Sequence, residues 1–236
     1  MLKLPDGITA CLFDLDGVIT QTAKLHAAAW KEMFDDYLRK RSEETGEPFE
    51  EFTPGDYDRY VDGRPRLDGV RTFLAARGIE HDDELVRRLG DRKNDLVLKL
   101  IRERGVEVYD GSIDFVKEAQ REGLRRAVVS SSANTREVLK SVGIEDLFEA
   151  VVDGIVAQRE GLPGKPAPDS FVAGARALGA QPQQAVVFED ALAGVEAGRA
   201  GGFGYVVGVN RTGQRDALAE HGADIVVDDL SELIER

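Results

Sequence analysis

The chain has 236 residues, 42% of them hydrophobic, which suffices for one large domain or for a core with a smaller second domain. Its 44 acidic and 31 basic residues give a formal charge of −13, so we expect neither a nucleic-acid partner nor binding to an anionic membrane surface. The single cysteine, Cys11, excludes a disulfide framework and a cysteine-rich zinc module and is typical of a reducing compartment. Because the sequence shows neither a signal-peptide pattern nor an uncharged apolar run of about 18 residues, we expect a cytoplasmic protein.

The first predicted element is a buried strand at residues 8–13, a short apolar run that ends at Asp14. The segment that follows, residues 21–104, contains no apolar strand run. Its sequence predicts several helices, at residues 22–41, 67–77 and 83–104. The acidic stretch at residues 41–51 predicts a solvated loop between the first two helices. A helical insert therefore follows the first strand directly.

Beyond the insert, short strands and helices alternate toward the end of the chain. The strands are rich in β-branched residues and are bounded by polar or glycine-containing turns. They are predicted at residues 126–129, 185–188, 205–207 and 225–227, and the helices at residues 112–121, 134–141, 169–178 and 191–200. This spacing is typical of βαβ units, so we predict an α/β protein with a doubly wound parallel sheet and helices on both faces.

Two aspartates separated by one residue stand at the end of the first strand. In an extended segment, Asp14 and Asp16 project to the same side while Leu15 points away. Open α/β sheets bind ligands outside the carboxyl ends of their strands. Two carboxylates about one pleat apart repel each other unless a divalent cation or a proton lies between them. One could therefore act as a nucleophile or metal ligand while the other exchanges protons, although a capped turn is the commoner explanation for such a pair.

Hydroxyl and amine groups follow other predicted elements at the same edge of the sheet. Ser130 and Ser131 come after an apolar strand and before a helix that begins near Asn134, so hydroxyls and backbone N–H groups could bind an anion there. Lys165 stands in a proline-containing loop before another helix. A serine run after a strand is more often a helix N-cap, and a single lysine is usually solvated, so neither feature is specific by itself.

A second acidic pair, Glu189 and Asp190, follows the apolar strand at residues 185–188 and precedes a helix. Helix capping explains Asp190 as well as metal ligation does when the pair is considered alone. Together, however, the loops at the carboxyl ends of the strands supply a nucleophile, a hydroxyl, a cation and a metal-binding acid in this order. Such a combination rarely arises by chance, and it predicts a catalytic site.

The order of these motifs resembles the haloacid dehalogenase (HAD) superfamily of phosphotransferases, and within it the β-phosphoglucomutase family. The superfamily motifs are residues 14–20, Ser130, the Lys-Pro-Ala-Pro-Asp run at 165–169, and Glu189-Asp190. The residues that resemble the β-phosphoglucomutase family in particular are His26, Trp30 and the Arg-Lys-Asn-Asp run at 92–95. The likeness covers essentially the whole chain. It implies a Rossmann-like HAD core at residues 1–20 and 105–236 and a helical cap domain at residues 21–104.

The resemblance implies a two-step phosphoryl transfer. Asp14 would attack the substrate phosphorus in line and form an aspartyl-phosphate, while Asp16 would protonate the leaving oxygen and later deprotonate the next nucleophile. Ser130 and Lys165 would hold the transferring phosphoryl oxygens. Further phosphate contacts are expected from Gly17, Ser131 and Asn134.

The resemblance also implies Mg²⁺ as the cofactor. Its ligands would be Asp14, the backbone carbonyl of Asp16, and Asp190, with Glu189 assisting. The ion would neutralise the charge that Asp14 otherwise presents to an anionic phosphate. The same likeness makes the Lys165–Pro166 peptide a candidate for the cis conformation.

Residues of the expected cap should determine the substrate, a small phosphorylated sugar. Arg66 matches a family arginine that binds the non-transferring phosphate, and Arg64 is a rival two residues away. Lys93 matches a lysine that reaches the sugar. His26 is expected near the catalytic aspartates, and Trp30 lies one helical turn later on the same face, where packing is the alternative to substrate contact.

The sequence departs from the mutase pattern near the expected site. Gln21 stands where the family commonly has aspartate, and Ala133 where the mutases carry a lysine for the distal phosphate. Residues 43–60 also form a longer and more acidic cap segment. The loss of one basic ligand weakens the expectation of a bisphosphate intermediate but leaves the aspartyl-phosphate chemistry intact.

Two activities remain open on the sequence alone, and two others are disfavoured. A β-phosphoglucomutase would convert β-glucose 1-phosphate to glucose 6-phosphate while excluding water, whereas a sugar-phosphate phosphatase would let water attack the same intermediate. A dehalogenase would need neither Asp16 nor Asp190, and a regulator without turnover would not need the complete set of catalytic residues. We expect the enzyme to be a monomer.

Overall fold

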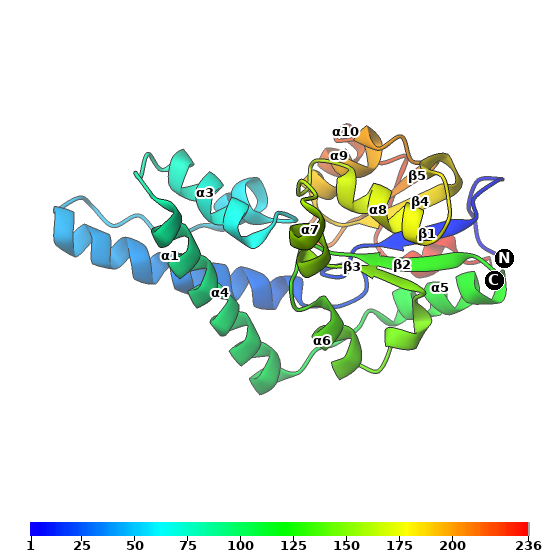
Figure 1. Cartoon of the computed structure of the whole chain (residues 1–236), viewed down its shortest axis with the longest axis horizontal. Coiled ribbons are helices and arrows are strands. Elements are labelled where there is room, and N and C mark those ends of the chain that lie inside the picture. The colour runs from blue at the N-terminus through cyan, green and yellow to red at the C-terminus, as the bar shows by residue number, and fades with distance from the viewer. Residues whose placement is uncertain (236) are drawn as a thin grey trace. The chain divides into compact units, whose positions relative to one another are not determined.

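The computed structural model of the chain describes residues 1–235 (Figure 1). The chain forms two compact units: unit 1 comprises Met1–Gln21 and Val106–Arg236, and unit 2 comprises Thr22–Gly105. Unit 1 is therefore interrupted in sequence by unit 2, after its first strand. Within residues 1–235, no helix is both long and apolar enough to cross a bilayer.

Unit 1 is built on a six-stranded parallel sheet in the order β3-β2-β1-β4-β5-β6. Its strands are β1 (Ala10–Phe13), β2 (Arg125–Val129), β3 (Ala150–Val152), β4 (Ala185–Glu189), β5 (Tyr205–Val209) and β6 (Ile225–Val227). The chain order reverses at β1, which lies between β2 and β4. The carboxyl ends of these three strands therefore form the switch point at which such sheets bind ligands. The topology confirms the predicted doubly wound fold.

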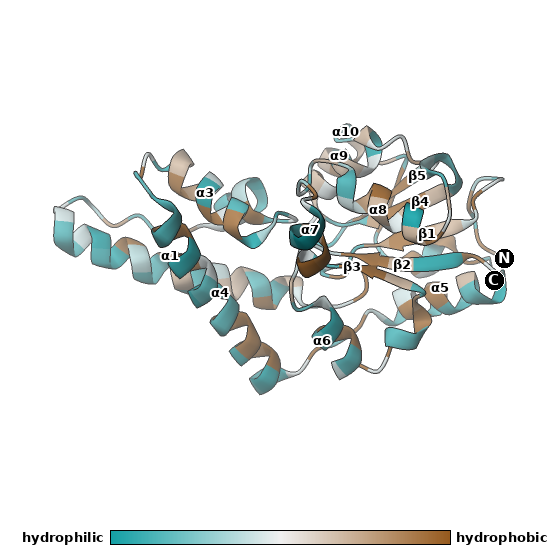
Figure 2. Ribbon diagram, viewed as in Figure 1, coloured by the Kyte–Doolittle hydropathy of each residue, from teal (hydrophilic) through white to brown (hydrophobic). Residues whose placement is uncertain are grey.

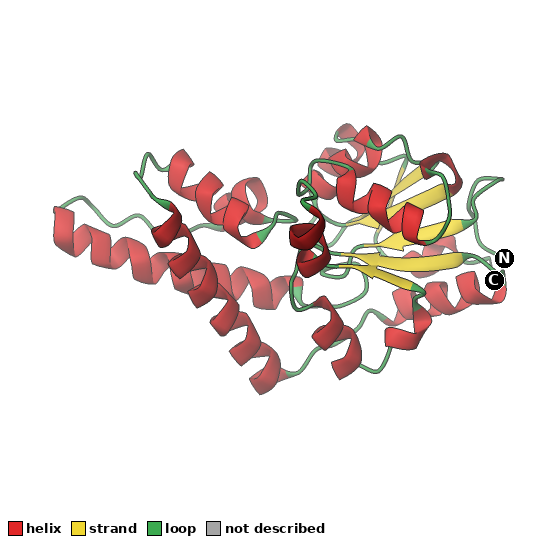
Figure 3. Cartoon of the chain, in the orientation of Figure 1, coloured by secondary structure: helices red, strands yellow, loops and turns green. Residues whose placement is uncertain are grey.

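Helices cover both faces of this sheet (Figure 3). They are α5 (Asp110–Arg121), α6 (Thr135–Ser141), α7 (Gly154–Glu160), α8 (Asp169–Ala177), α9 (Leu192–Ala200) and α10 (Arg215–Glu220). On β1, Leu12 belongs to a buried cluster with Phe171 of α8, whereas Phe13 stacks on Phe188 with ring centroids 4.6 Å apart and meets Phe115 of α5 at 6.1 Å. Because both faces are buried, the strands are mainly hydrophobic along their length (Figure 2).

The sequence did not predict β3, α7 or α10. β3 spans three residues, α7 seven and α10 six, and at these lengths periodicity is a weak signal. Short length does not prevent a prediction, because β6 and α6 are as short as β3 and α7 and were predicted. The longer elements lie within a few residues of the predicted bounds, and the Lys165–Pro166 peptide is cis as predicted.

Unit 2, all of whose residues 22–105 the structure describes, is built of helices and connecting loops without strands. It contains α1 (Ala23–Thr45), α2 (Pro54–Asp56), the π-helix η1 (Tyr57–Val61), α3 (Arg66–Ala76) and α4 (Asp83–Arg104). Its core is aromatic: the ring of Phe34 lies 4.1 Å from that of Phe73, 5.0 Å from Phe52 and 5.3 Å from Trp30. The prediction of a loop at residues 41–51 was wrong for its first part, because α1 continues to Thr45 and ends only at Gly46, whose φ of 75° suits glycine.

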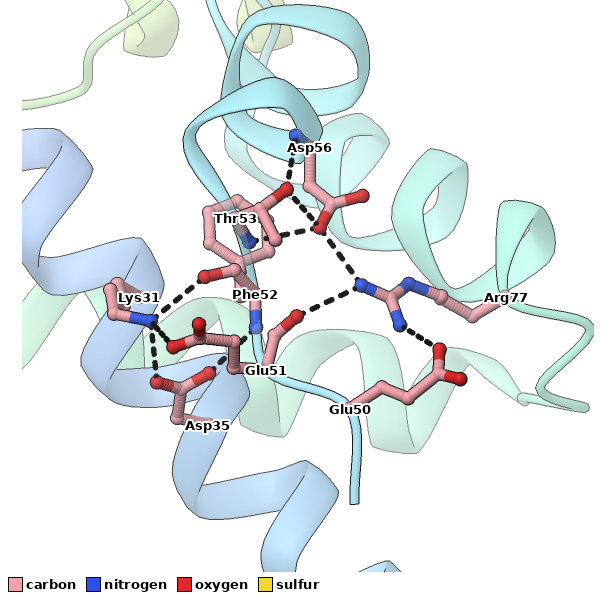
Figure 4. A network of polar contacts seen from close by, with 8 residues as sticks. All are labelled: Lys31, Asp35, Glu50, Glu51, Phe52, Thr53, Asp56 and Arg77. Carbon is pink, nitrogen blue, oxygen red and sulfur yellow. Dashed lines mark hydrogen bonds and ion pairs between the residues drawn. The ribbon is translucent and has the colours of Figure 1, made fainter. Parts of the chain in front are cut away.

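Lys31 on α1 anchors the acidic segment that follows this helix (Figure 4). Its Nζ lies 2.7 Å from Glu51 and 3.0 Å from Asp35, and it donates to the carbonyl of Phe52 at 2.9 Å. Asp35 in turn accepts from the backbone N–H of Phe52 at 2.8 Å. The C-terminal end of the acidic segment is therefore bound to α1. These contacts hold the backbone at Phe52, whose ring lies in the core of unit 2.

A second cation, Arg77 at the end of α3, holds the same segment from the other side (Figure 4). Its guanidinium donates to Asp56 at 2.8 Å, to Glu50 at 2.9 Å and to the carbonyl of Glu51 at 3.0 Å. Asp56 also accepts from the backbone N–H of Thr53 at 2.9 Å and from its hydroxyl at 2.8 Å, which completes a capping box for α2. Partial burial opposes ionisation, but the hydrogen bonds from Thr53 and Arg77 prevail and lower the pKa of Asp56.

The lowered pKa of Asp56 predicts an acid-sensitive contribution to stability. A carboxyl whose pKa is lower in the folded than in the unfolded chain stabilises the fold above its unfolded value of about 4, and this stabilisation is lost as pH falls through the folded pKa. We expect D56N to lower the free energy of unfolding by about 1–2 kcal/mol at neutral pH, and by progressively less in acid. Urea denaturation followed by the fluorescence of Trp30, the single tryptophan, measures the difference.

The matched control is E50Q, because Glu50 also bonds to Arg77 but its side chain is 75% exposed. We expect this variant to lie within about 0.5 kcal/mol of the wild type. A D56N variant as stable as the wild type at neutral pH, or a difference that persists unchanged in acid, would contradict the assignment.

Candidate active site

The first acidic loop begins directly where β1 ends. The backbone N–H of Asp14 donates to the carbonyl of Phe188 in β4 at 3.0 Å, which continues the ladder between the two strands by one residue. Asp14 is 7% exposed. The chain then turns sharply, because Gly17 N–H donates to the carbonyl of Thr20 at 2.8 Å. Asp16 therefore stands at the entry to a tight turn immediately after the buried Asp14.

Lys165 brings together the acidic loops that follow β1 and β4. Its Nζ lies 2.6 Å from Asp14 Oδ1 and also donates to Glu189 Oε1. Both Lys165 and Glu189 are almost completely buried, and the lysine ammonium lies 4.9 Å from the centroid of the Phe171 ring. Glu189 also accepts from the backbone N–H of Ala191 at 2.9 Å. The lysine that sequence alone could interpret as solvated surface is thus a buried cation between two acids.

The electrostatic balance of this cluster leaves an excess of negative charge. Burial, followed by the neighbouring Glu189 and Asp16, raises the pKa of Asp14 against the opposing effect of Lys165. Burial disfavours the charged form of Lys165, but the carboxylates of Asp14 and Glu189 outweigh it and raise the pKa of the lysine. One ammonium cannot neutralise all the nearby carboxylates, so ionised Asp14 needs a further cation.

Three carboxylates are placed to hold such a cation. Oxygen atoms of Asp14, Glu189 and Asp190 all lie within 4.8 Å of one another. Carboxylate oxygens are the ligands that hard divalent cations prefer, so the donor set fits such an ion. The carboxylate of Asp16 does not belong to this group. Its predicted contribution through the backbone carbonyl stays a prediction. Glu189, which sequence assigned to the metal, has Lys165 as its direct partner.

Ser130 follows β2, next to β1 in the sheet, and is 4% exposed. Its backbone N–H donates to the carbonyl of Val152 in β3 at 2.9 Å, and its hydroxyl oxygen accepts from Ser132 N–H at 3.1 Å. Ser131 lies in the same loop, and the backbone N–H of Asn134 donates to the Ser132 hydroxyl at 3.2 Å. The loop at the end of β2 is thus held by its own hydrogen bonds at the switch point of the sheet.

Gly17 and Gly194 are required by close approach of the acidic side chains. At Gly17, which has a φ of 84°, an added Cβ would lie 1.8 Å from Asp190 Oδ2. At Gly194 in α9, it would lie 1.8 Å from Glu189 Oε1. The structure places Gly17 against Asp190, and the phosphate contact that sequence analysis expected of Gly17 stays a prediction. Sequence analysis gave no role to Gly194, because the contact depends on packing between α9 and β4.

The predicted substrate residues lie in unit 2, where three of them form one group. Lys93 of α4 is 6% exposed, and its Nζ lies 2.9 Å from His26 Nδ1 and 4.9 Å from the centroid of the Trp30 ring. Arg66 is not part of this group: its Nη2 lies 3.4 Å from Asp91, and its Nε is buried without a hydrogen-bond partner among the described residues. The backbone N–H of Arg64 donates to the carbonyl of Val61 at 3.3 Å.

The sequence analysis missed two polar residues that contact the acidic loops. Gln214 donates from Nε2 to the backbone carbonyl of Asp190 at 2.9 Å, and Arg211 donates from Nε to that of Gly17 at 2.7 Å. Both follow β5, the strand beside β4. The rule that selected Asp14 and Ser130, polar residues just beyond an apolar strand, applies equally to Asn210-Arg211 and could have found this loop.

The strand order β3-β2-β1-β4-β5-β6, with an acidic cluster and a buried lysine at the switch point, is the arrangement that the sequence motifs led us to expect of the HAD superfamily. Residues 8–202 match the haloacid dehalogenase-like hydrolase family. The chain therefore belongs to this family and is an enzyme of the HAD superfamily, which confirms the resemblance predicted from its motifs.

Within the superfamily, the chain is most usefully compared with proteins named β-phosphoglucomutase. It is 53% identical to that of Mycobacterium bovis over 247 residues, which cover 99% of this chain and 94% of the relative. It is 31% identical to that of Bacillus subtilis, over 95% of this chain and 91% of the relative. The crystal structure of β-phosphoglucomutase from Clostridium difficile superposes with a TM-score of 0.79 at 26% identity, covering 96% of this chain and 93% of that one.

Two glycine variants test the close approach between Gly17 and Asp190. G17A should lower phosphoryl-transfer activity by about 100-fold, because the new methyl group must displace the Asp190 carboxylate from the candidate cation site. G7A is the control, since Gly7 has a similar φ of 87° but no atom within 4 Å of an added Cβ. Both variants should lose about 1–2 kcal/mol of stability through backbone strain. Equal activity in the two variants would show that backbone strain alone, and not the contact with Asp190, limits position 17.

Proposed function

We propose that the protein is a Mg²⁺-dependent β-phosphoglucomutase, which converts β-glucose 1-phosphate to glucose 6-phosphate through an aspartyl-phosphate. The observation that carries this proposal is 53% identity to a protein of that name along nearly the whole chain. The cluster of Asp14, Lys165, Glu189 and Asp190 at the switch point supports the chemistry. In this proposal unit 1 is the catalytic core domain and unit 2 is the cap domain.

In the first step, an oxygen of Asp14 forms a bond to phosphorus while the bond between phosphorus and the leaving oxygen breaks. The nucleophile must be ionised, and the ammonium of Lys165, 2.6 Å from Asp14 Oδ1, favours this form. Lys165 and the Ser130 hydroxyl then bind equatorial oxygens of the phosphoryl group, where negative charge is spread in the transition state. Asp16 donates its proton to the leaving oxygen.

In the second step, the phosphoryl group passes from Asp14 to the 6-hydroxyl of β-glucose 1-phosphate and forms glucose 1,6-bisphosphate. Asp16, now ionised, takes the proton of that hydroxyl as the new oxygen–phosphorus bond forms and the bond to Asp14 breaks. When the first step then transfers the 1-phosphate of this bisphosphate to Asp14, glucose 6-phosphate leaves and the aspartyl-phosphate is regenerated. The acid of one half-reaction is therefore the base of the other, and Asp16 is restored to its protonated form. Its place at the entry to a turn, outside the carboxylate group of the metal site, suits a residue that exchanges protons.

Mg²⁺ would be held by carboxylates of Asp14 and Asp190, with the Asp16 carbonyl as a further ligand. When bound, the ion supplies positive charge that lets an anionic nucleophile approach an anionic phosphate. Glu189 holds Lys165 in place and contributes charge to the site rather than a primary ligand, as its contact with the lysine suggests.

Residues of unit 2 would bind the sugar and its other phosphate. Lys93 is a buried cation held by His26 and Trp30, so its ammonium is fixed in direction, as recognition of a sugar hydroxyl or phosphate oxygen requires. The unpartnered Nε of Arg66 favours this residue over Arg64 as the second phosphate ligand. Ala133 leaves the distal phosphate with one basic ligand fewer than the family pattern.

The products formed by the wild type test the mutase assignment. Incubated with Mg²⁺, β-glucose 1-phosphate and a trace of glucose 1,6-bisphosphate, the protein should form glucose 6-phosphate well ahead of inorganic phosphate. D14N should lose at least about 10⁴-fold in rate, because the nucleophile is absent. Phosphate release without glucose 6-phosphate would instead establish a sugar-phosphate phosphatase, in which water attacks the aspartyl-phosphate.

Removal of divalent cations tests the carboxylate site. Chelation should abolish activity, and added Mg²⁺ should restore it. Calorimetric titration with Mg²⁺ should show binding to the wild type and binding weakened by about tenfold or more in D190N. Substitution D228N is the control, because Asp228 is 64% exposed and pairs with Arg215. Full activity in the presence of excess chelator would contradict the proposed metal requirement. The cytoplasmic location and the monomeric state stay predictions from the sequence.

A further inference from the structure

Arg211, in the loop after β5, connects two segments that flank the first acidic loop. Its Nε donates to the backbone carbonyl of Gly17 at 2.7 Å, and its Nη1 donates to that of Asp228 at 2.8 Å. The guanidinium also stacks on the ring of Tyr109, with the Arg211 Cζ 3.5 Å from the ring centroid. The Nη2 atom is buried and has no hydrogen-bond partner among the described residues. The arginine is therefore held in one orientation by contacts on three sides.

The segments that Arg211 contacts are hydrogen-bonded to each other. Gly17 and Thr20 close the turn after Asp16, and Thr20 pairs with Val108 in an antiparallel bridge. The backbone N–H of Tyr109, the next residue, donates to the carbonyl of Ile19 at 3.0 Å. The turn that carries Asp16 is thus supported on one side by residues 108–109, and Arg211 stacks on this support while it binds the turn itself.

We propose that Arg211 is a positioning residue for Asp16, acting through the Gly17 carbonyl one peptide unit away. The proposal rests on the proposed function for the reaction, in which Asp16 donates a proton to one oxygen and takes a proton from another. A displacement of about 1 Å in such a group can cost about 100-fold in rate. Because Arg211 fixes the peptide between residues 17 and 18, its loss frees the turn to rotate and moves the Asp16 carboxyl away from the reacting oxygens.

Only arginine satisfies these contacts together. Its planar guanidinium donates in two fixed directions, to Gly17 and Asp228, while one face lies on Tyr109. A lysine carries a single ammonium on a flexible chain, which can reach one of the carbonyls but cannot stack as a plane on the ring. A lysine at position 211 should therefore restore charge without restoring orientation.

The test compares steady-state kinetics of R211A and R211K with those of the wild type, using β-glucose 1-phosphate and Mg²⁺. We expect kcat of R211A to fall about 10- to 100-fold while KM stays within about threefold, since Arg211 touches the turn and not the substrate. R211K should show an intermediate kcat. Arg215, the first residue of α10, provides the matched control, because it pairs with the Asp228 side chain at 2.9 Å. R215A should keep the wild-type kcat.

Three outcomes would overturn the positioning role: an unchanged kcat in R211A, a loss that appears only in KM, or an equal loss in R215A. If R211A does not fold, the kcat of R211K tests the positioning role, because this variant keeps the charge and most of the side-chain volume. A wild-type kcat in R211K would then overturn the proposal. The assignment as a mutase is tested separately by the product of the wild type. If that product is inorganic phosphate, the ratio of variant to wild-type kcat for phosphate release decides the role of Arg211 in the same way.

Discussion

The structure depends on one constraint: several carboxylates must stay close together, largely buried, with a single lysine among them. At about 4 Å, two unit charges interact by roughly 4 kcal/mol at an effective dielectric constant of about 20, so ionised Asp14 and Glu189 would drive the site apart without Lys165. The lysine side chain is 1% exposed and contacts both acids. It balances only part of the charge. A divalent cation bound by Asp14, Glu189 or Asp190 would balance the rest, and in the proposed function it would let the site accept an anionic phosphate.

The fold meets this constraint by bringing strand ends and glycines together. Parallel strands β2, β1 and β4 end at one edge, so residues more than 100 positions apart in the chain become neighbours there, as the hydrogen bond from the Asp14 N–H to the Phe188 carbonyl shows. Gly17 and Gly194 then remove the side chains that would keep Asp190 and Glu189 at a distance. The loop after β5 completes the arrangement, because Arg211 and Gln214 bind the backbone of both acidic loops without adding charge between the carboxylates.

Unit 2 has an architecture of its own, in which helices pack around aromatic side chains. It is stabilised by its own aromatic core around Phe34 and by the ion pairs of Lys31 and Arg77, which bind the acidic segment before α2. On this frame Lys93 is buried against His26 and Trp30, so a flexible side chain becomes a rigid donor. This packing fixes the direction of the Lys93 ammonium, and in the proposed function that residue would contribute to the choice of substrate.

The sequence by itself determined the class of fold and most of the chemistry. Apolar runs followed by acids or hydroxyls placed Asp14, Ser130 and Asp190 at strand ends, because the alternation of strand and helix is a local property of the chain. The analysis of the sequence missed β3 and α7, in which periodicity is weak, and the helical residues at the end of α1. Only the tertiary structure decided that Glu189 partners Lys165, that Gly194 must lack a side chain, and that Arg211 supports the turn of Asp16. These contacts join segments far apart in the chain, and no local pattern encodes the distances between them.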